Sequence, residues 1–154
     1  EGLVNHVRQN CRDWDIVRHA LSTLLLLLEI PDAVAAFDRG TGETVLVALL
    51  GLPPPEDLQV MSLDVLWMAA VTRPKIVQTA DLMWRRAEGM MYQCWRTMST
   101  ARDPSKHQVA VASLGALRAL AETNPVLRGE LADSFCAPET PILDVIVTHM
   151  TKSP

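Results

Sequence analysis

Apolar residues recur every three or four positions along most of the chain, which is the spacing of an amphipathic helix. The first such stretch follows Asp13, whose short carboxylate suits an N-cap. Pro31 ends it, because proline has no backbone N–H to continue the helix. The predicted inward residues are Ile16, Val17, Ala20, Leu21, Leu24, Leu25, Leu27 and Leu28.

Two short apolar segments follow this helix. The pattern predicts a helix over 31–37 and a turn over 39–42. The segment 44–50 fits either a helix or a strand, because Thr44, Val45 and Val47 are β-branched. A single isolated strand has no pairing partner, so the helix is favoured.

The proline run 53–55 separates these segments from a helix predicted over 56–71. A long helical stretch over 74–98, bent near Gly89, is expected next. Three further helices are predicted over 104–121, 125–134 and from Pro141 to about Met150. The residues predicted to be mostly inward on 56–71 are Leu58, Met61, Leu63, Val65, Leu66, Trp67 and Ala70.

The sequence contains an internal repeat, because separate segments share the same residues at matching positions. When 63–74 is set over 114–125 without gaps, two leucines, an alanine, a threonine and a proline recur. Leu21 and Leu24 match Leu63 and Leu66 in the same way. Units of this size cannot bury their apolar side alone, so neighbours are expected to stack. The units are 13–51, 56–99 and 104–150.

The order of the segments 19–25, 31–37 and 44–50 resembles the third helix of one armadillo repeat followed by the first and second helices of the next. The resemblance covers most of the chain and implies an all-α, right-handed α-solenoid of about three armadillo/HEAT-like repeats. The chain 1–154 is then one domain. Its start at Glu1, with Leu3, Val4 and Val7 on one helical side, indicates a piece of a longer protein.

The same resemblance implies where a partner binds, because third helices line the groove of armadillo proteins. The row that often carries a groove asparagine holds Glu29, Val71 and Glu122 here, a departure that argues against main-chain capture of an extended peptide. The partner-binding candidates are Arg18, Ser22, Leu25, Glu29, Asp64, Trp67, Val71, Arg118 and Glu122.

The acidic candidates favour a basic partner, with Trp67 as an aromatic anchor. In the alternative interpretation the carboxylates only solvate helix ends and Trp67 belongs to the core. The same two interpretations apply to Trp84 and Trp95, which share one helical side with flanking methionines. Arg85 and Arg86 add a basic bias that suits a solvated face or a phosphate-binding patch.

Composition narrows the function classes. The 154 residues carry a net charge of −4, so the chain lacks the basic footprint of a nucleic-acid binder. Cys11, Cys94 and Cys136 are odd in number and widely spaced, which excludes a disulfide scaffold or a metal clip. No signal peptide or membrane-length apolar run is present. An intracellular location, cytoplasmic or nuclear, is expected.

No motif for catalysis or cofactor binding is present. Gly40 and Gly42 lack the other residues of a phosphate loop, and no histidine has another histidine or a cysteine three or four residues away. We therefore expect no enzyme, cofactor or metal. The expected function is a scaffold or adaptor that binds a peptide or helix of a partner. The alternatives are a homodimerisation module and a HEAT-like nucleic-acid-associated module.

Overall fold

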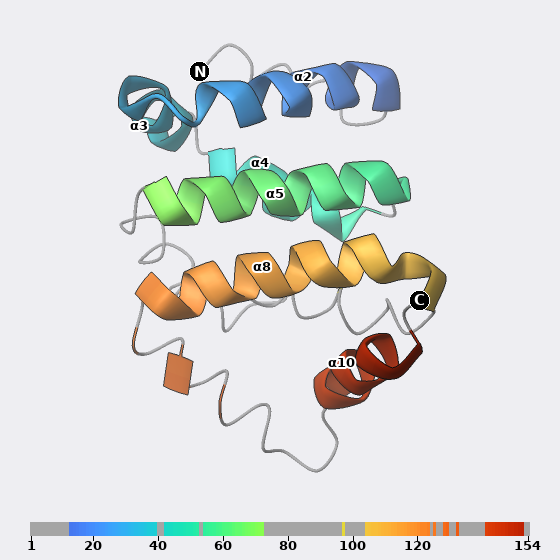
Figure 1. Cartoon of the computed structure of the whole chain (residues 1–154). Helices are drawn as coiled ribbons and strands as arrows, with labels where there is room; N and C mark the ends of the chain where they lie inside the picture. The colour runs from blue at the N-terminus through green and yellow to red at the C-terminus, as the bar shows by residue number, and fades with distance from the viewer. Residues whose placement is uncertain are drawn as a thin grey trace.

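The computed structural model describes residues 13–39, 42–52, 54–72, 97, 104–123, 125, 128–129, 132 and 141–152. Every regular element within these ranges is a helix, which confirms the all-helical class. The elements are α2 (Trp14–Leu27), α3 (Pro31–Arg39), α4 (Gly42–Gly51), α5 (Glu56–Thr72), the 3₁₀ turn η1 (Pro104–Lys106), α8 (His107–Thr123) and α10 (Pro141–Lys152) (Figure 1).

Helix α2 begins and ends where its sequence predicts. Asp13 is its N-cap, and a carboxylate oxygen of Asp13 accepts a hydrogen bond of 3.3 Å from the Ile16 N–H. At the other end the Leu28 N–H donates to the Leu24 carbonyl at 2.9 Å. Pro31 then opens α3, so the predicted break is confirmed.

The ambiguous segment 44–50 is helical and lies within α4, so the strand alternative is wrong. Its first residue is Gly42, and a Cβ added there would overlap the ring of Phe37. Only glycine therefore allows α4 to begin directly against the α3 aromatic ring.

Helices α2, α5 and α8 lie side by side in successive layers, with α5 in the middle (Figure 1). All three run in the same direction, and α3 and α4 carry the chain back from the end of α2 to the start of α5. The segments around Leu24, Leu66 and Leu117 therefore occupy consecutive layers.

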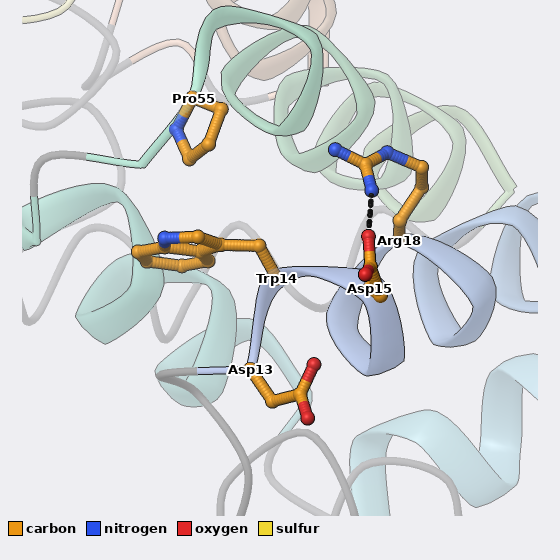
Figure 2. Close-up of a pocket in the computed structure, with 5 residues that line it drawn as sticks. All are labelled: Asp13, Trp14, Asp15, Arg18 and Pro55. Atoms are coloured by element: carbon orange, nitrogen blue, oxygen red, sulfur yellow. Dashed lines mark hydrogen bonds and ion pairs between the residues drawn. The ribbon is translucent and has the colours of Figure 1, made fainter.

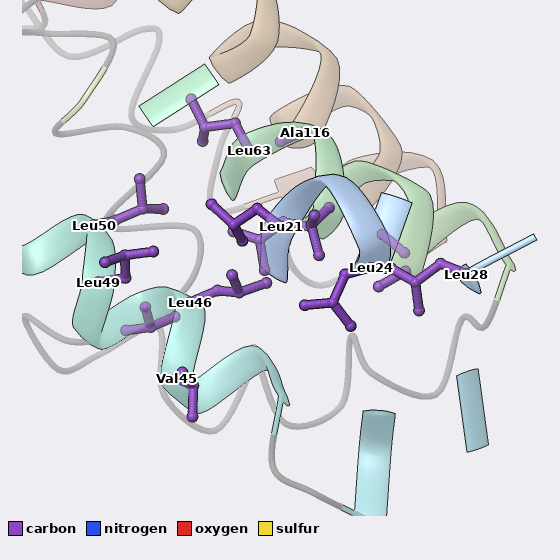
Figure 3. Close-up of a cluster of buried hydrophobic side chains, with 14 of the residues drawn as sticks. Leu21, Leu24, Leu28, Val45, Leu46, Leu49, Leu50, Leu63 and Ala116 are labelled. Carbon is purple, nitrogen blue, oxygen red and sulfur yellow. The ribbon is translucent and has the colours of Figure 1, made fainter. Parts of the chain in front are cut away.

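A single apolar cluster joins these layers. Leu21 and Leu24 of α2 belong to the same buried cluster as Leu46 and Leu49 of α4, and so does Leu28, the C-cap of α2 (Figure 3). Burial also recurs at the spacing of the sequence repeat, since equivalent positions are buried on α2, α5 and α8. These positions are Ala20 and Leu24, Ser62 and Leu66, and Ser113 and Leu117.

Two residues predicted to face inward do not. Leu27 is exposed at the end of α2, and Trp67 is exposed on α5. The apolar spacing marks a wide side of each helix but not its edges, and both residues lie at an edge. On α8, Pro104 opens the helical run as predicted, although its first turn is the 3₁₀ turn η1.

Several predictions fall outside the described residues. These are the helical stretch 74–96 with Trp84, Trp95, Arg85 and Arg86, all three cysteines, and the N-terminal segment with Leu3, Val4 and Val7. Most of 125–134 lies outside as well. Among the described residues, none of the helices combines the length and apolarity that crossing a bilayer requires.

Candidate functional site

Helix α5 is largely buried between its neighbours, and an exposed stripe runs along its later turns. Asp64, Trp67 and Val71 follow one another at spacings of three and four residues, so they share one side of the helix. Trp67 is 44% exposed and Val71 57% exposed, whereas Asp64 is half-buried. The neighbouring positions Leu66 and Ala70 are fully buried, so this stripe is where the middle layer meets solvent.

The indole of Trp67 reaches across to α8. A Cβ placed on Gly115 would lie 3.2 Å from Cε3, 3.4 Å from Cζ3 and 3.5 Å from Cδ2 of that ring. These distances mean that the six-membered ring rests directly against the α8 main chain. Trp67 therefore connects the exposed stripe of α5 to α8.

An ion pair joins α5 to its other neighbour, α2. The Arg18 guanidinium donates to Asp57 through Nε at 2.7 Å and to Asp15 through Nη1 at 2.6 Å. The hydrogen bond from Arg18 lowers the pKa of Asp57 below its usual range, and the same bond raises the pKa of Arg18. The acceptors Asp15 and Asp57 thus already hold this arginine between the two layers.

Helix α8 has an ion pair between two of its own residues. Arg118 donates through Nε to Glu122 at 2.7 Å, one turn along the helix, and this bond raises the pKa of Arg118. Arg128 donates to the main-chain carbonyl of Ala121 at 3.1 Å, near the end of the same helix. Arg118 and Glu122 are therefore already paired with each other.

None of the nine predicted partner-binding residues is fully buried. The Arg18–Asp57 pair joins α2 to α5, and the Trp67–Gly115 contact joins α5 to α8, so Arg18 and Trp67 lie at the junctions between neighbouring layers. The nine predicted residues are named here the shared face. The interpretation of Trp67 as a core residue is wrong. The shared face comprises Arg18, Ser22, Leu25, Glu29, Asp64, Trp67, Val71, Arg118 and Glu122.

Asp64 differs from the other acidic residues of α5 that the structure describes. Burial raises the pKa of its carboxyl group, because the charged form loses hydration. Within the described ranges, no hydrogen bond or ion pair to Asp64 offsets that loss. The shared face therefore contains a half-buried carboxylate without a described cationic partner, beside an exposed indole.

Two contacts of the shared face were not predicted from the sequence. Asp57 lies 39 residues after Arg18, and nothing in the local pattern links them. Gly115 falls in the same row as Ser22 and Asp64, and a glycine in the middle of a helical pattern, where it weakens the helix, is a signal of a packing constraint. That signal identifies the position, but the aromatic ring that occupies it comes from another helix.

A shallow hollow of about 650 Å³ opens at the start of α2. Figure 2 shows Trp14 and Pro55 on one side of it, and the Arg18–Asp15 pair on the other. Asp13 completes the lining but already caps α2. Because every charged group here except Asp13 takes part in an ion pair, and Asp13 accepts the cap bond, the hollow offers little unused binding capacity.

The fold brings together two histidines that are far apart in sequence. The rings of His107 on α8 and His149 on α10 have centroids 5.5 Å apart and are tilted by 47°. Within the described part of the chain no third histidine, cysteine or carboxylate joins them to form a group that could hold a metal ion. Two imidazoles supply too few ligands for a tetrahedral protein site.

The shared face combines features that protein-binding surfaces favour. Tryptophan is enriched where binding energy is concentrated, and an apolar neighbour such as Val71 extends the contact. Carboxylates in such surfaces favour groups of opposite charge, and Asp64 is a half-buried carboxylate of this face. No family model matches the chain, and no curated protein or solved structure does so either.

Proposed function

We propose that this chain is a helical interaction module, without catalysis, whose shared face binds a basic peptide or helix of a protein partner. The observation that carries the proposal is the exposure of Trp67 at the centre of the stack. A large aromatic side chain placed there leaves apolar surface in water, although neighbouring positions of α5 are completely buried. A partner that covers Trp67 would remove that surface from solvent.

The distribution of charge supports a basic partner. Arg18 is engaged by two carboxylates and Arg118 by Glu122, so these cations and their acceptors are already paired. Asp64 has no such described partner, and Glu29 is exposed in the turn that follows α2. A lysine or arginine of the partner would supply the missing positive charge, whereas an acidic segment would add repulsion.

The arrangement of the helices supports an armadillo/HEAT-like solenoid as the framework for this face. Three parallel helices in successive layers, with α3 and α4 as the return, follow the order expected of such repeats. Burial recurs at the repeat spacing. The row that would hold asparagines contains Glu29, Val71 and Glu122, which favours recognition through side chains of the partner over capture of its main chain.

A crosslinking pull-down from cell extract, quantified for each captured protein, tests the proposal. A Trp67→Ala, Glu29→Arg double variant is expected to lose the partner that the wild type captures. The matched control is Val147→Ala, which removes an exposed apolar side chain of α10 that belongs neither to the shared face nor to α2. Equal capture by the wild type and the double variant would reject the shared face as the binding site.

Self-association is a second candidate function, and a separate observation favours it. Leu26 of α2 is 73% exposed, and Ile30, in the link between α2 and α3, is 51% exposed. Exposed apolar patches of this kind often pair in homodimers. Light scattering over a concentration series should then show a mass increase that Leu26→Glu abolishes. A strict monomer at high concentration removes this candidate.

A further inference from the structure

We infer that Gly115 is a positioning residue for the shared face: it holds the Trp67 indole against α8 so that one ring face receives a lysine or arginine side chain paired with Asp64. This inference rests on the proposed function and names the group that the central part of the face would bind. Gly115 itself touches no partner; it acts through Trp67.

The geometry of the ring supports the first part. The three ring atoms nearest to a Cβ on Gly115 are consecutive, and their distances of 3.2, 3.4 and 3.5 Å are nearly equal. An approach in the plane of the ring would leave the two outer atoms much farther away, so α8 approaches the ring from above one face. Trp67 is nevertheless 44% exposed, so part of the residue that α8 does not cover is open to solvent.

The choice of glycine follows from the same contact. Apart from proline, glycine is the weakest helix former, yet it stands in the middle of α8. An alanine Cβ would be tighter against the ring than an ordinary van der Waals contact, so the indole would have to give way by a few tenths of an ångström. A larger side chain would lift the ring from α8 and change the direction that its open face points.

Asp64 identifies the occupant. It lies three residues before Trp67 on the exposed stripe of α5 and is half-buried without a described cation. A cation above an indole is attracted by the ring, and a nearby carboxylate adds a charge-assisted hydrogen bond. Asp57 and Glu122, in contrast, are already engaged by Arg18 and Arg118.

Fluorine NMR of protein labelled with 5-fluorotryptophan tests the positioning role without any partner. The Trp67 resonance is assigned by its loss in Trp67→Phe. Gly115→Leu is expected to shift that resonance, and Gly115→Ala to shift it less. The matched control is Gly129→Leu, because a Cβ on Gly129 meets no atom within 4 Å. Leucine is a good helix former, so circular dichroism should show α8 retained.

The result that overturns the positioning role is a Trp67 resonance that stays in place in Gly115→Leu while the fold is intact. A resonance that shifts equally in Gly129→Leu would overturn it as well, because the shift would then not depend on the contact with α8. The fluorine spectra decide these questions even if no partner binds.

Titration with an alanine–lysine peptide and an alanine–glutamate peptide tests the occupant. The wild type should bind the lysine peptide, and Gly115→Leu and Asp64→Asn should each weaken that binding by about two- to fivefold. Gly129→Leu should bind as the wild type does. A shifted Trp67 resonance with unchanged affinity would overturn the inference. Binding of neither peptide by the wild type, or preference for the glutamate peptide, would reject a basic partner and with it the proposed function.

Discussion

Asp57 and Asp64 lie two turns apart on α5, yet their surroundings move the pKa of each carboxyl group in opposite directions. Hydrogen bonding from Arg18 lowers the pKa of Asp57, whereas burial raises that of Asp64. Asp57 is therefore suited to joining α2 to α5, and Asp64 remains able to accept a cation from outside. Two aspartates on one helix thus differ in their surroundings and in whether a cation is already bound to them.

This difference predicts opposite pH dependences for two variants. Because the folded pKa of Asp64 is raised, its favourable contribution to folding exists at acidic pH and is lost as pH rises through the raised pKa. Asp64→Asn should therefore raise the melting temperature at neutral pH, and the gain should vanish below a pH of about 3.9, the ordinary pKa of aspartate. Thermal denaturation of both proteins across this range is the measurement.

Asp57→Asn serves as the comparison, with the reverse sign. The lowered pKa of Asp57 stabilises the fold above the ordinary aspartate pKa, and this contribution is lost as pH falls through the lowered value. The variant should be less stable than the wild type at neutral pH and converge with it in acid. An Asp64→Asn variant that is no more stable at neutral pH would contradict the assigned environment of Asp64.

The core is expected to be most sensitive at fully buried leucines of the middle layer. Leu66 has no exposed surface, so Leu66→Ala should cost about 2–5 kcal/mol of unfolding free energy. Leu27 is exposed at the end of α2, and Leu27→Ala should change stability by only about 0.5 kcal/mol. Chemical denaturation of both variants checks this, and equal losses would show that Leu66 does not lie in the core.

At the scale of elements, single residues near the ends of the helices determine where α2, α3 and α4 begin. Asp13 caps α2, Pro31 opens α3 and Gly42 permits the close start of α4. The nature of 44–50 is less local, because its β-branched residues suit a strand and only its packing against α5 favours a helix. Helix ends are thus predictable from single residues, while an ambiguous apolar segment is decided by its neighbours.

The cap of α2 provides a test at this scale. Asp13→Ala removes the acceptor for the Ile16 N–H and should cost about 0.5–1 kcal/mol, near the lower end for N-caps because the bond is long at 3.3 Å. Asp13→Asn keeps a cap oxygen and should retain most of the stability. If both substitutions cost the same in urea denaturation, the hydrogen bond is not what stabilises the start of α2.

At the scale of the whole molecule, the recurring leucines were enough to predict stacked helices, but not which side chains lie at the edges. Leu24, Leu66 and Leu117 follow from periodicity, because every third or fourth position points inward. Trp67 lies at the boundary of that pattern, and its exposure depends on how α5 sits against α8. Likewise, Arg18 meets Asp57 only because α2 and α5 are neighbours.

The layered arrangement predicts that backbone amides in different helices are protected from hydrogen exchange to different extents. Helix α5 packs against both α2 and α8, so its backbone amides should exchange with solvent more slowly than those of α3 and α10. Hydrogen–deuterium exchange resolved by helix measures this directly. Faster exchange in α5 than in α3 would be incompatible with α5 as the middle layer.

The claim that α2, α5 and α8 present one binding face is tested most directly by a chemical-shift footprint. The alanine–lysine peptide is added to ¹⁵N-labelled protein, and the perturbed amides are assigned. The account predicts that the changes concentrate at Ser22, Asp64, Trp67 and Arg118, with little change at Phe37 on α3. Changes centred on α3 and α4, or none along the shared face, would contradict it.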